Sequence, residues 1–280
     1  MSLVAKGYSP SPRPTYDRPT LITTDTVRRH VWGDRETGLV ADWIYASTER
    51  IHVLQFGVAA DGGFRHSPAY RTVFGADEVL HVVSGTMVAA NPETGEVVRA
   101  GPGDSVFFRR NTWHHAFAHG GEPLRVIEFF APPPATGSSG PYAKARPYLE
   151  DSTYRRDSLL GALPVGATES TLRVVEKRDL SWRREGGILI GLIASTEHLT
   201  VGILEVDAGV HGEPTAHGGD AVLVMLDGSV MVRTTWNDAF EVFEAGRGDA
   251  VYLPLGTIYE VLSFGGASRA VLGVAPSYLR

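Results

Sequence analysis

The stretch GPGDSVFF, from Gly101 to Phe108, returns later in the chain as GRGDAVYL, from Gly246 to Leu253. Each copy joins a glycine-rich turn to a run of apolar and aromatic residues, a pattern that predicts a turn leading into a strand. The offset between the two copies changes only from 148 residues at the first matching pair to 144 at the last. Three more pairs keep the same order along the chain: ASTERIHVLQFGV from Ala46 and ASTEHLTVGILEV from Ala194, VVSGTMV from Val82 and MLDGSVMV from Met225, RVIEFFAP from Arg125 and RAVLGVAP from Arg269. The chain is therefore a duplicated domain.

Length and composition restrict the class of protein. The 280 residues suit two domains of ordinary size. No apolar run approaches the ~20 residues that span a bilayer, and the N-terminus lacks a signal-peptide pattern, so we expect a cytoplasmic protein. The absence of cysteine excludes disulfide scaffolds, Cys-zinc sites and thiol nucleophiles. The net charge of −6, with scattered Lys and Arg, argues against nucleic-acid partners and favours small molecules.

The pattern of turns and apolar runs predicts four segments. These are an N-terminal arm over 1–36, a first unit over 37–131, a Pro/Gly-rich linker over 132–170 and a second unit over 171–280. Within each unit, short runs of Val, Ile, Phe and Tyr alternate with Gly, Pro, Asn and Asp, which predicts strands. About eight strands per unit and no long amphipathic helix predict an all-β protein made of two tandem jelly-roll β-barrels.

Two spacings in the first unit carry a family resemblance. Glu78 stands seven residues before Gly85 in EVLHVVSG, and His114 stands eleven after Gly103 in GDSVFFRRNTWH. The second unit keeps a Pro-x-Gly turn in GDAVYLPLGTIY. In these features the chain resembles the cupin superfamily, whose domains hold a metal through a His-x-His pair, a Glu and a later His. The resemblance covers both units and implies a bicupin.

The first unit departs from the cupin pattern at the His-x-His pair. A gapless alignment from Glu78 places the two positions at Arg71 and Val73. The nearest upstream histidine is His66, which can serve as a ligand if the intervening SPAYRTVFGAD makes an excursion, for which its Pro and Gly are suited. The resemblance then implies His66, Glu78 and His114 as ligands of one divalent metal. Two imidazoles and a carboxylate favour Fe(II), with Zn, Mn or Ni as alternatives.

Strand alternation gives an independent reason to place two of these residues together. Glu78 shares a strand face with Leu80 and Val82, and His114 shares one with Ala116. A buried Glu among apolar residues needs a partner charge or a metal. Two interpretations stay open: a metal centre in which Glu78 and His114 are the catalytic residues, or a core histidine hydrogen-bonded to Glu78 without a metal. Arg71 is either a substrate-carboxylate anchor or a solvated loop charge.

The second unit retains too few ligands for such a centre. Ala221 stands where the Glu is expected and Tyr259 replaces the His, which leaves His211, His217 and Tyr259 as a degenerate site. We expect this unit to act as a scaffold.

Three functions remain compatible with these observations. The first is a metal-dependent enzyme acting on a small, partly aromatic or carboxylated substrate in the first cavity, with dioxygenase, isomerase, cyclase and lyase chemistry all represented among similar cupins. The second is a metal-free binding or sensing protein, and the third is a structural or storage protein. We expect a homodimer in which the segment from Leu21 to Val31 adds a strand or strap to a barrel.

Overall fold

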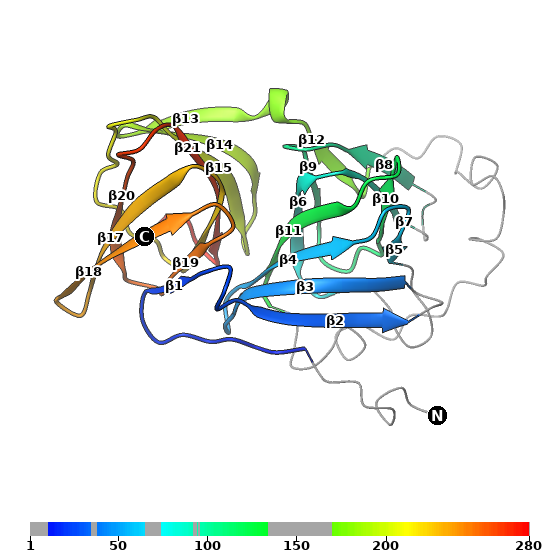
Figure 1. Ribbon diagram of the computed structural model, residues 1–280, viewed down its shortest axis with the longest axis horizontal. Coiled ribbons are helices and arrows are strands. Elements are labelled where there is room, and N and C mark those ends of the chain that lie inside the picture. The colour runs from blue at the N-terminus through cyan, green and yellow to red at the C-terminus, as the bar shows by residue number, and fades with distance from the viewer. Residues whose placement is uncertain are drawn as a thin grey trace.

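The computed structural model describes residues 11–34, 38–64, 74–91, 94, 96–133 and 170–279 (Figure 1). The regular structure of these residues consists of strands and one 3-10 turn at Lys177–Asp179. The prediction of two duplicated jelly-roll barrels is confirmed. Among the described residues no helix is long and apolar enough to cross a membrane.

The first barrel packs a seven-stranded sheet against a four-stranded one. The longer sheet has the order β12 (Arg173–Val175), β9 (Ser105–Phe108), β6 (Asp77–Ser84), β11 (Leu124–Ala131), β4 (His52–Val58), β3 (Gly38–Ser47), β2 (Arg28–Asp34). The shorter sheet has the order β5 (Gly63–Phe64), β10 (His115–His119), β7 (Thr86–Asn91), β8 (Glu96–Ala100). Alternate residues of both sheets, such as Leu80, Val126 and Ala116, fill the space between them as one apolar core.

The second barrel repeats this plan. Its seven-stranded sheet has the order β1 (Thr20–Ile22), β19 (Ala250–Leu253), β16 (Asp220–Asp227), β21 (Ser268–Ala275), β15 (Thr200–Val206), β14 (Ile188–Ser195), β13 (Ser181–Glu185). Its smaller sheet has the order β18 (Ala239–Gly246), β17 (Ser229–Trp236), β20 (Ile258–Leu262). A separate core lies between these two sheets.

Each long sheet ends on a strand that comes from elsewhere in the chain. The N-terminal strand β1 pairs with β19, with Leu21 opposite Val251, so the arm extends the second barrel's sheet. In return β12, which begins at Arg173, pairs with β9 of the first barrel. An added strand at Leu21 therefore exists, and it pairs within the same chain.

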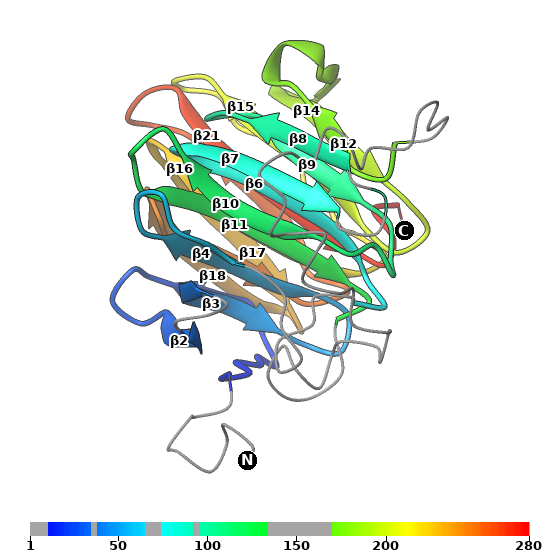
Figure 2. The ribbon, with the colours of Figure 1, turned by 90° about the vertical axis from the view of Figure 1, so that its right-hand side faces the viewer.

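The two seven-stranded sheets pack face to face, which places the barrels side by side (Figure 1; Figure 2 views the pair from the first barrel's side). One apolar cluster spans the contact and contains Val53 and Phe129 from the first barrel with Val201, Val222 and Val271 from the second. The molecule thus has three stacked apolar layers, one inside each barrel and one between them.

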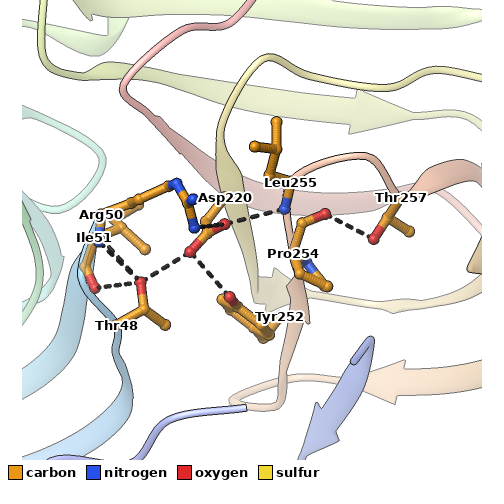
Figure 3. Close-up of polar contacts among 8 residues, drawn as sticks. All are labelled: Thr48, Arg50, Ile51, Asp220, Tyr252, Pro254, Leu255 and Thr257. Atoms are coloured by element: carbon orange, nitrogen blue, oxygen red, sulfur yellow. Dashed lines mark hydrogen bonds and ion pairs between the residues drawn. The ribbon is translucent and has the colours of Figure 1, made fainter. Parts of the chain in front are cut away.

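A buried carboxylate of the second barrel binds the turn between β3 and β4 of the first barrel (Figure 3). Asp220 accepts hydrogen bonds from Thr48 Oγ1 at 2.9 Å, Tyr252 Oη at 2.9 Å and the Leu255 backbone N–H at 3.0 Å. Arg50 lies 3.4 Å from the same carboxylate. Because Thr48 and Arg50 precede β4, these contacts cross the interface between the barrels.

The repeat places a second carboxylate, Asp77, at the equivalent position of the first barrel. It accepts a hydrogen bond from the Arg110 backbone N–H at 3.0 Å and pairs with Arg109 at 3.2 Å. Arg109 also pairs with Glu197, which lies in the second barrel's equivalent turn. In both cases a carboxylate at the start of a strand is linked to a turn of the other barrel, through Arg50 of the turn in one case and through Arg109 beside the carboxylate in the other.

Candidate metal centre

Three strands of the first barrel bring ionisable side chains into its interior. Glu78 is the second residue of β6, His114 immediately precedes β10, and Glu128 lies in the middle of β11. Each shares its strand face with residues of the barrel core, such as Leu80 beside Glu78 and Val126 beside Glu128. Strand alternation therefore directs all three into the same apolar space.

These side chains form one compact group. One ligand atom from each lies within 4.8 Å of the others, and His114 Nε2 is 3.6 Å from Glu78 Oε2. The exposed fractions are 1% for Glu78, 6% for His114 and 8% for Glu128. Within the part of the chain that the structure describes, Glu78 Oε2 is buried and makes no hydrogen bond. A buried oxygen of this kind fits a cation ligand.

The imidazole of His114 is oriented by the backbone. Its Nδ1 lies 3.3 Å from the Thr112 carbonyl, which can only accept, so Nδ1 carries the proton in the neutral ring. Burial lowers the pKa of His114 to about 4, which keeps the ring neutral at neutral pH. The Nε2 lone pair therefore faces Glu78. Phe108, 4.4 Å from the imidazole between ring centroids, covers the ring and excludes water.

The two glutamates are costly to ionise together. Burial raises the pKa of Glu78 well above its usual range, and the neighbouring Glu128 and Asp77 raise it further. Burial also raises the pKa of Glu128, with an added contribution from Asp42. A divalent cation between the two carboxylates would supply a positive partner and so favour their ionised forms. The donor set therefore fits a metal on chemical grounds.

Glu78 and His114, both expected from the sequence, are brought together in this group. The expected ligand His66 and the expected anchor Arg71 lie outside the described residues. Glu128 was not predicted, although the same signal marks it: it shares a strand face with the apolar residues Val126 and Phe130. Its counterpart in the repeat is Leu272, so comparing the two copies would also have identified it.

The second barrel differs at every corresponding position. Ala221, Tyr259 and Leu272 stand in place of Glu78, His114 and Glu128. Within residues 170–279 no comparable group of three ligating side chains occurs. Of the two histidines expected there, His217 contacts Tyr259, with 2.9 Å between Nε2 and Oη. His211 is exposed and pairs through its backbone with Leu262.

Comparisons with known proteins agree with the fold. No curated protein sequence matched the chain. A sequence model described as the cupin domain matches residues 74–130. Among solved structures, an oxalate decarboxylase variant from Bacillus subtilis superposes with a TM-score of 0.70 at 10% identity, covering 96% of this chain and 80% of that one.

Two further structures superpose over most of their length. A protein named as glyoxylate-induced from Pseudomonas aeruginosa gives a TM-score of 0.65 at 16% identity, covering 96% of this chain and 93% of that one. The formate complex of an oxalate decarboxylase from Lactobacillus farciminis gives 0.64 at 11% identity, covering 97% and 90%. Residues 74–130 thus match the cupin domain, and the chain as a whole has the two-barrel fold of these structures.

Proposed function

We propose that the interior of the first barrel is the active site of a metal-dependent enzyme that acts on a small carboxylated molecule. The observation that carries this proposal is the buried group of Glu78, His114 and Glu128, in which an unbonded carboxylate oxygen faces an imidazole lone pair. The similar structures support the substrate class, because two of them are oxalate decarboxylases and one of those two contains formate.

The donor atoms narrow the choice of metal. Glu78 and Glu128 would bind through carboxylate oxygens and His114 through Nε2, which gives an oxygen-rich set balanced in charge for a divalent ion. Such a set suits Mn(II) as well as the Fe(II) favoured from the sequence, since Glu128 adds a second hard oxygen donor. When bound, the metal would act as a Lewis acid on a carboxylate or carbonyl oxygen of the substrate.

The surrounding residues orient the ligands and hold a proton. Thr112 fixes the ring of His114, and Phe74 and Phe108 pack beside it. Asp42 is buried, and its burial raises the pKa of its carboxyl while Trp32 hydrogen-bonds to it. The strand register sets Asp42 opposite Phe56, and Phe56 opposite Val126, which shares a strand face with Glu128. We therefore propose Asp42 as the acid that gives or takes a proton near the ligands.

For the reaction, we place carbon–carbon lyase chemistry on a small carboxylate first, because the similar structures include decarboxylases. The dioxygenase expected from the sequence is the second candidate, since one imidazole with carboxylates also suits Fe(II). The two differ in their products: a decarboxylase releases carbon dioxide without net oxygen uptake, whereas a dioxygenase consumes oxygen.

Metal reconstitution tests this proposal. After loading with Mn(II) or Fe(II) under anaerobic conditions, we expect about one tightly bound metal per chain by elemental analysis, because among the described residues one group of three ligating side chains occurs and it lies in the first barrel. Oxalate, 2-oxo acids and aromatic carboxylates are then screened for carbon dioxide release and oxygen uptake.

Single variants identify the ligands in the same assay. His114→Ala and Glu128→Gln should each weaken metal binding by about tenfold or more, whereas Glu122→Gln, which alters an exposed carboxylate of the same barrel, should leave it unchanged. Full occupancy in His114→Ala, or about two metals per chain, would contradict the assignment. A first barrel that takes up no metal would favour the metal-free binding protein.

A further inference from the structure

The second barrel contains a cavity of about 300 Å³ at the place where the first barrel holds its ionisable group. Its lining includes Ile190, Tyr259 and Leu272, which are the repeat counterparts of Asp42, His114 and Glu128. Because these replacements are neutral side chains, the described residues that line the cavity include no cluster of buried carboxylates that a metal would have to neutralise. The volume is at the lower end of the range for small-molecule sites.

A chain of hydrogen bonds forms the polar side of this cavity. His217 Nδ1 donates to the Tyr278 carbonyl at 2.7 Å, so its Nε2 accepts from the Tyr259 hydroxyl at 2.9 Å. The Tyr278 hydroxyl in turn donates to Glu185 Oε2 at 2.8 Å. Both tyrosine protons are therefore already in use.

The groups that remain for a ligand are acceptors. They are the Tyr259 oxygen and the second oxygen of Glu185, both from residues that line the cavity. Glu213 also lines the cavity, but it is exposed, so solvent screens its charge. Arg183, the cation close to Tyr278, is exposed, so solvent screens its charge. The Tyr259 oxygen and the Glu185 carboxylate together select a ligand with donors and a positive charge.

We propose that the second barrel binds a small primary amine with an apolar body. The ammonium group would lie at the wall formed by Glu185 and Tyr259, and the apolar body would contact Leu204, Ile190 and Leu272. This site is independent of the metal centre and adds ligand binding to the scaffold role expected from the sequence.

Three molecules of similar size test the proposal on the full chain: phenethylamine, 2-phenylethanol and 3-phenylpropionate. Titration calorimetry and saturation-transfer NMR are expected to show phenethylamine binding about tenfold more tightly than 3-phenylpropionate, because a hydrogen bond to a charged group is worth about that factor. No binding of phenethylamine to the wild-type chain, or equal binding of the carboxylate, would overturn the proposal.

Variants locate the site. Glu185→Gln keeps an acceptor for the Tyr278 hydroxyl but removes the charge. The affinity for phenethylamine should therefore fall by about tenfold, while the affinity for 2-phenylethanol stays the same. Ile190→Phe should fill the cavity and abolish binding of all three, with circular dichroism confirming that the variant folds. Glu244→Gln, an exposed carboxylate on β18, is the matched control and should change nothing. An unchanged affinity in Glu185→Gln would refute the site even if Ile190→Phe failed to fold.

Discussion

At four equivalent positions the first barrel carries an ionisable side chain and the second carries one that stays neutral at neutral pH. The pairs are Asp42 and Ile190, Glu78 and Ala221, His114 and Tyr259, Glu128 and Leu272. The scaffold tolerates these changes because its sheets are held by backbone hydrogen bonds and by apolar residues on the same faces. Single residues therefore set the chemistry of each barrel while the fold stays the same.

A buried histidine on the outer face of β6 gives a prediction about acid stability. His81 lies 2.9 Å from Ser105 Oγ, and burial, with Arg269 nearby, lowers its pKa to about 4. Its unfolded pKa is about 6.5. The stabilisation is therefore complete above about pH 6.5 and is lost as the pH falls toward 4, because the unfolded chain then binds a proton that the folded chain excludes.

Urea unfolding between pH 7 and pH 4 measures this effect. We expect the free energy of unfolding of His81→Asn to fall less steeply with acid than that of the wild type, by up to about 1.4 kcal/mol per pH unit. His119→Asn, at an exposed position, should keep the wild-type slope. Glu78 and Glu128, whose pKa values are raised, favour the folded state as the pH falls, which is opposite to the effect of His81. The contribution of His81 is therefore read from the difference in slope between the two variants. If the free energy of unfolding of both variants fell with the same slope against pH, His81 would not contribute to the loss of stability in acid.

The sequence predicted part of the candidate site. Spacing and alternation selected Glu78 and His114, because both signals are local in the chain. Glu128 carried the alternation signal without a motif beside it, and its relation to Glu78 depends on the register between β6 and β11, in which Phe130 rather than Glu128 lies opposite Glu78. Such long-range register depends on tertiary packing and cannot be predicted from the sequence of either strand alone.

Among the elements, the short edge strands β1 and β12 were the hardest to assign. The strand runs expected from Val, Ile and Phe became β4, β6, β9 and β11. By contrast β1 and β12 have three residues each, and their partners β19 and β9 lie far away in the sequence. A pattern of three residues cannot specify a partner, so the exchange of edge strands between barrels follows from backbone groups that need pairing.

The edge strand β1 gives a prediction about stability. Ile22 is 2% exposed and belongs to the apolar cluster between the barrels. Ile22→Ala should therefore lower the free energy of unfolding by about 2–4 kcal/mol, as expected for a buried large-to-small change. Val31→Ala, in the neighbouring β2 but 60% exposed, should change it by less than about 0.5 kcal/mol. Chemical denaturation compares them, and equal effects would mean that the arm adds no stability.

For the whole molecule, the arm does not require a second copy. Its described strand pairs with β19 of the same chain, and Tyr16 Oη donates to the Tyr45 carbonyl at 3.1 Å. The homodimer expected from the sequence stays a prediction, which light scattering of the full chain checks. The contact that the structure does describe is the one between barrels, where both seven-stranded sheets contribute to a single core.

Gly273 of β21 lies directly against the ring of Phe129 of β11. A Cβ atom added at Gly273 would lie 2.2 Å from Phe129 Cδ1, far inside van der Waals contact. Phe129 is fully buried, so its ring has no room to move away. Gly273→Ala should therefore destabilise the protein by about 1–3 kcal/mol through overpacking between the barrels.

A double-mutant cycle shows whether this contact is the cause. In a Phe129→Leu background the shorter side chain leaves space for the methyl group, so Gly273→Ala should cost less there, with a coupling free energy of about 1 kcal/mol or more. Gly265→Ala is the control, because a Cβ there meets nothing within 4 Å. Urea denaturation of the four proteins gives the cycle. Strictly additive losses would show that the two barrels do not meet at this pair, because only a shared contact makes the cost of the methyl group depend on residue 129.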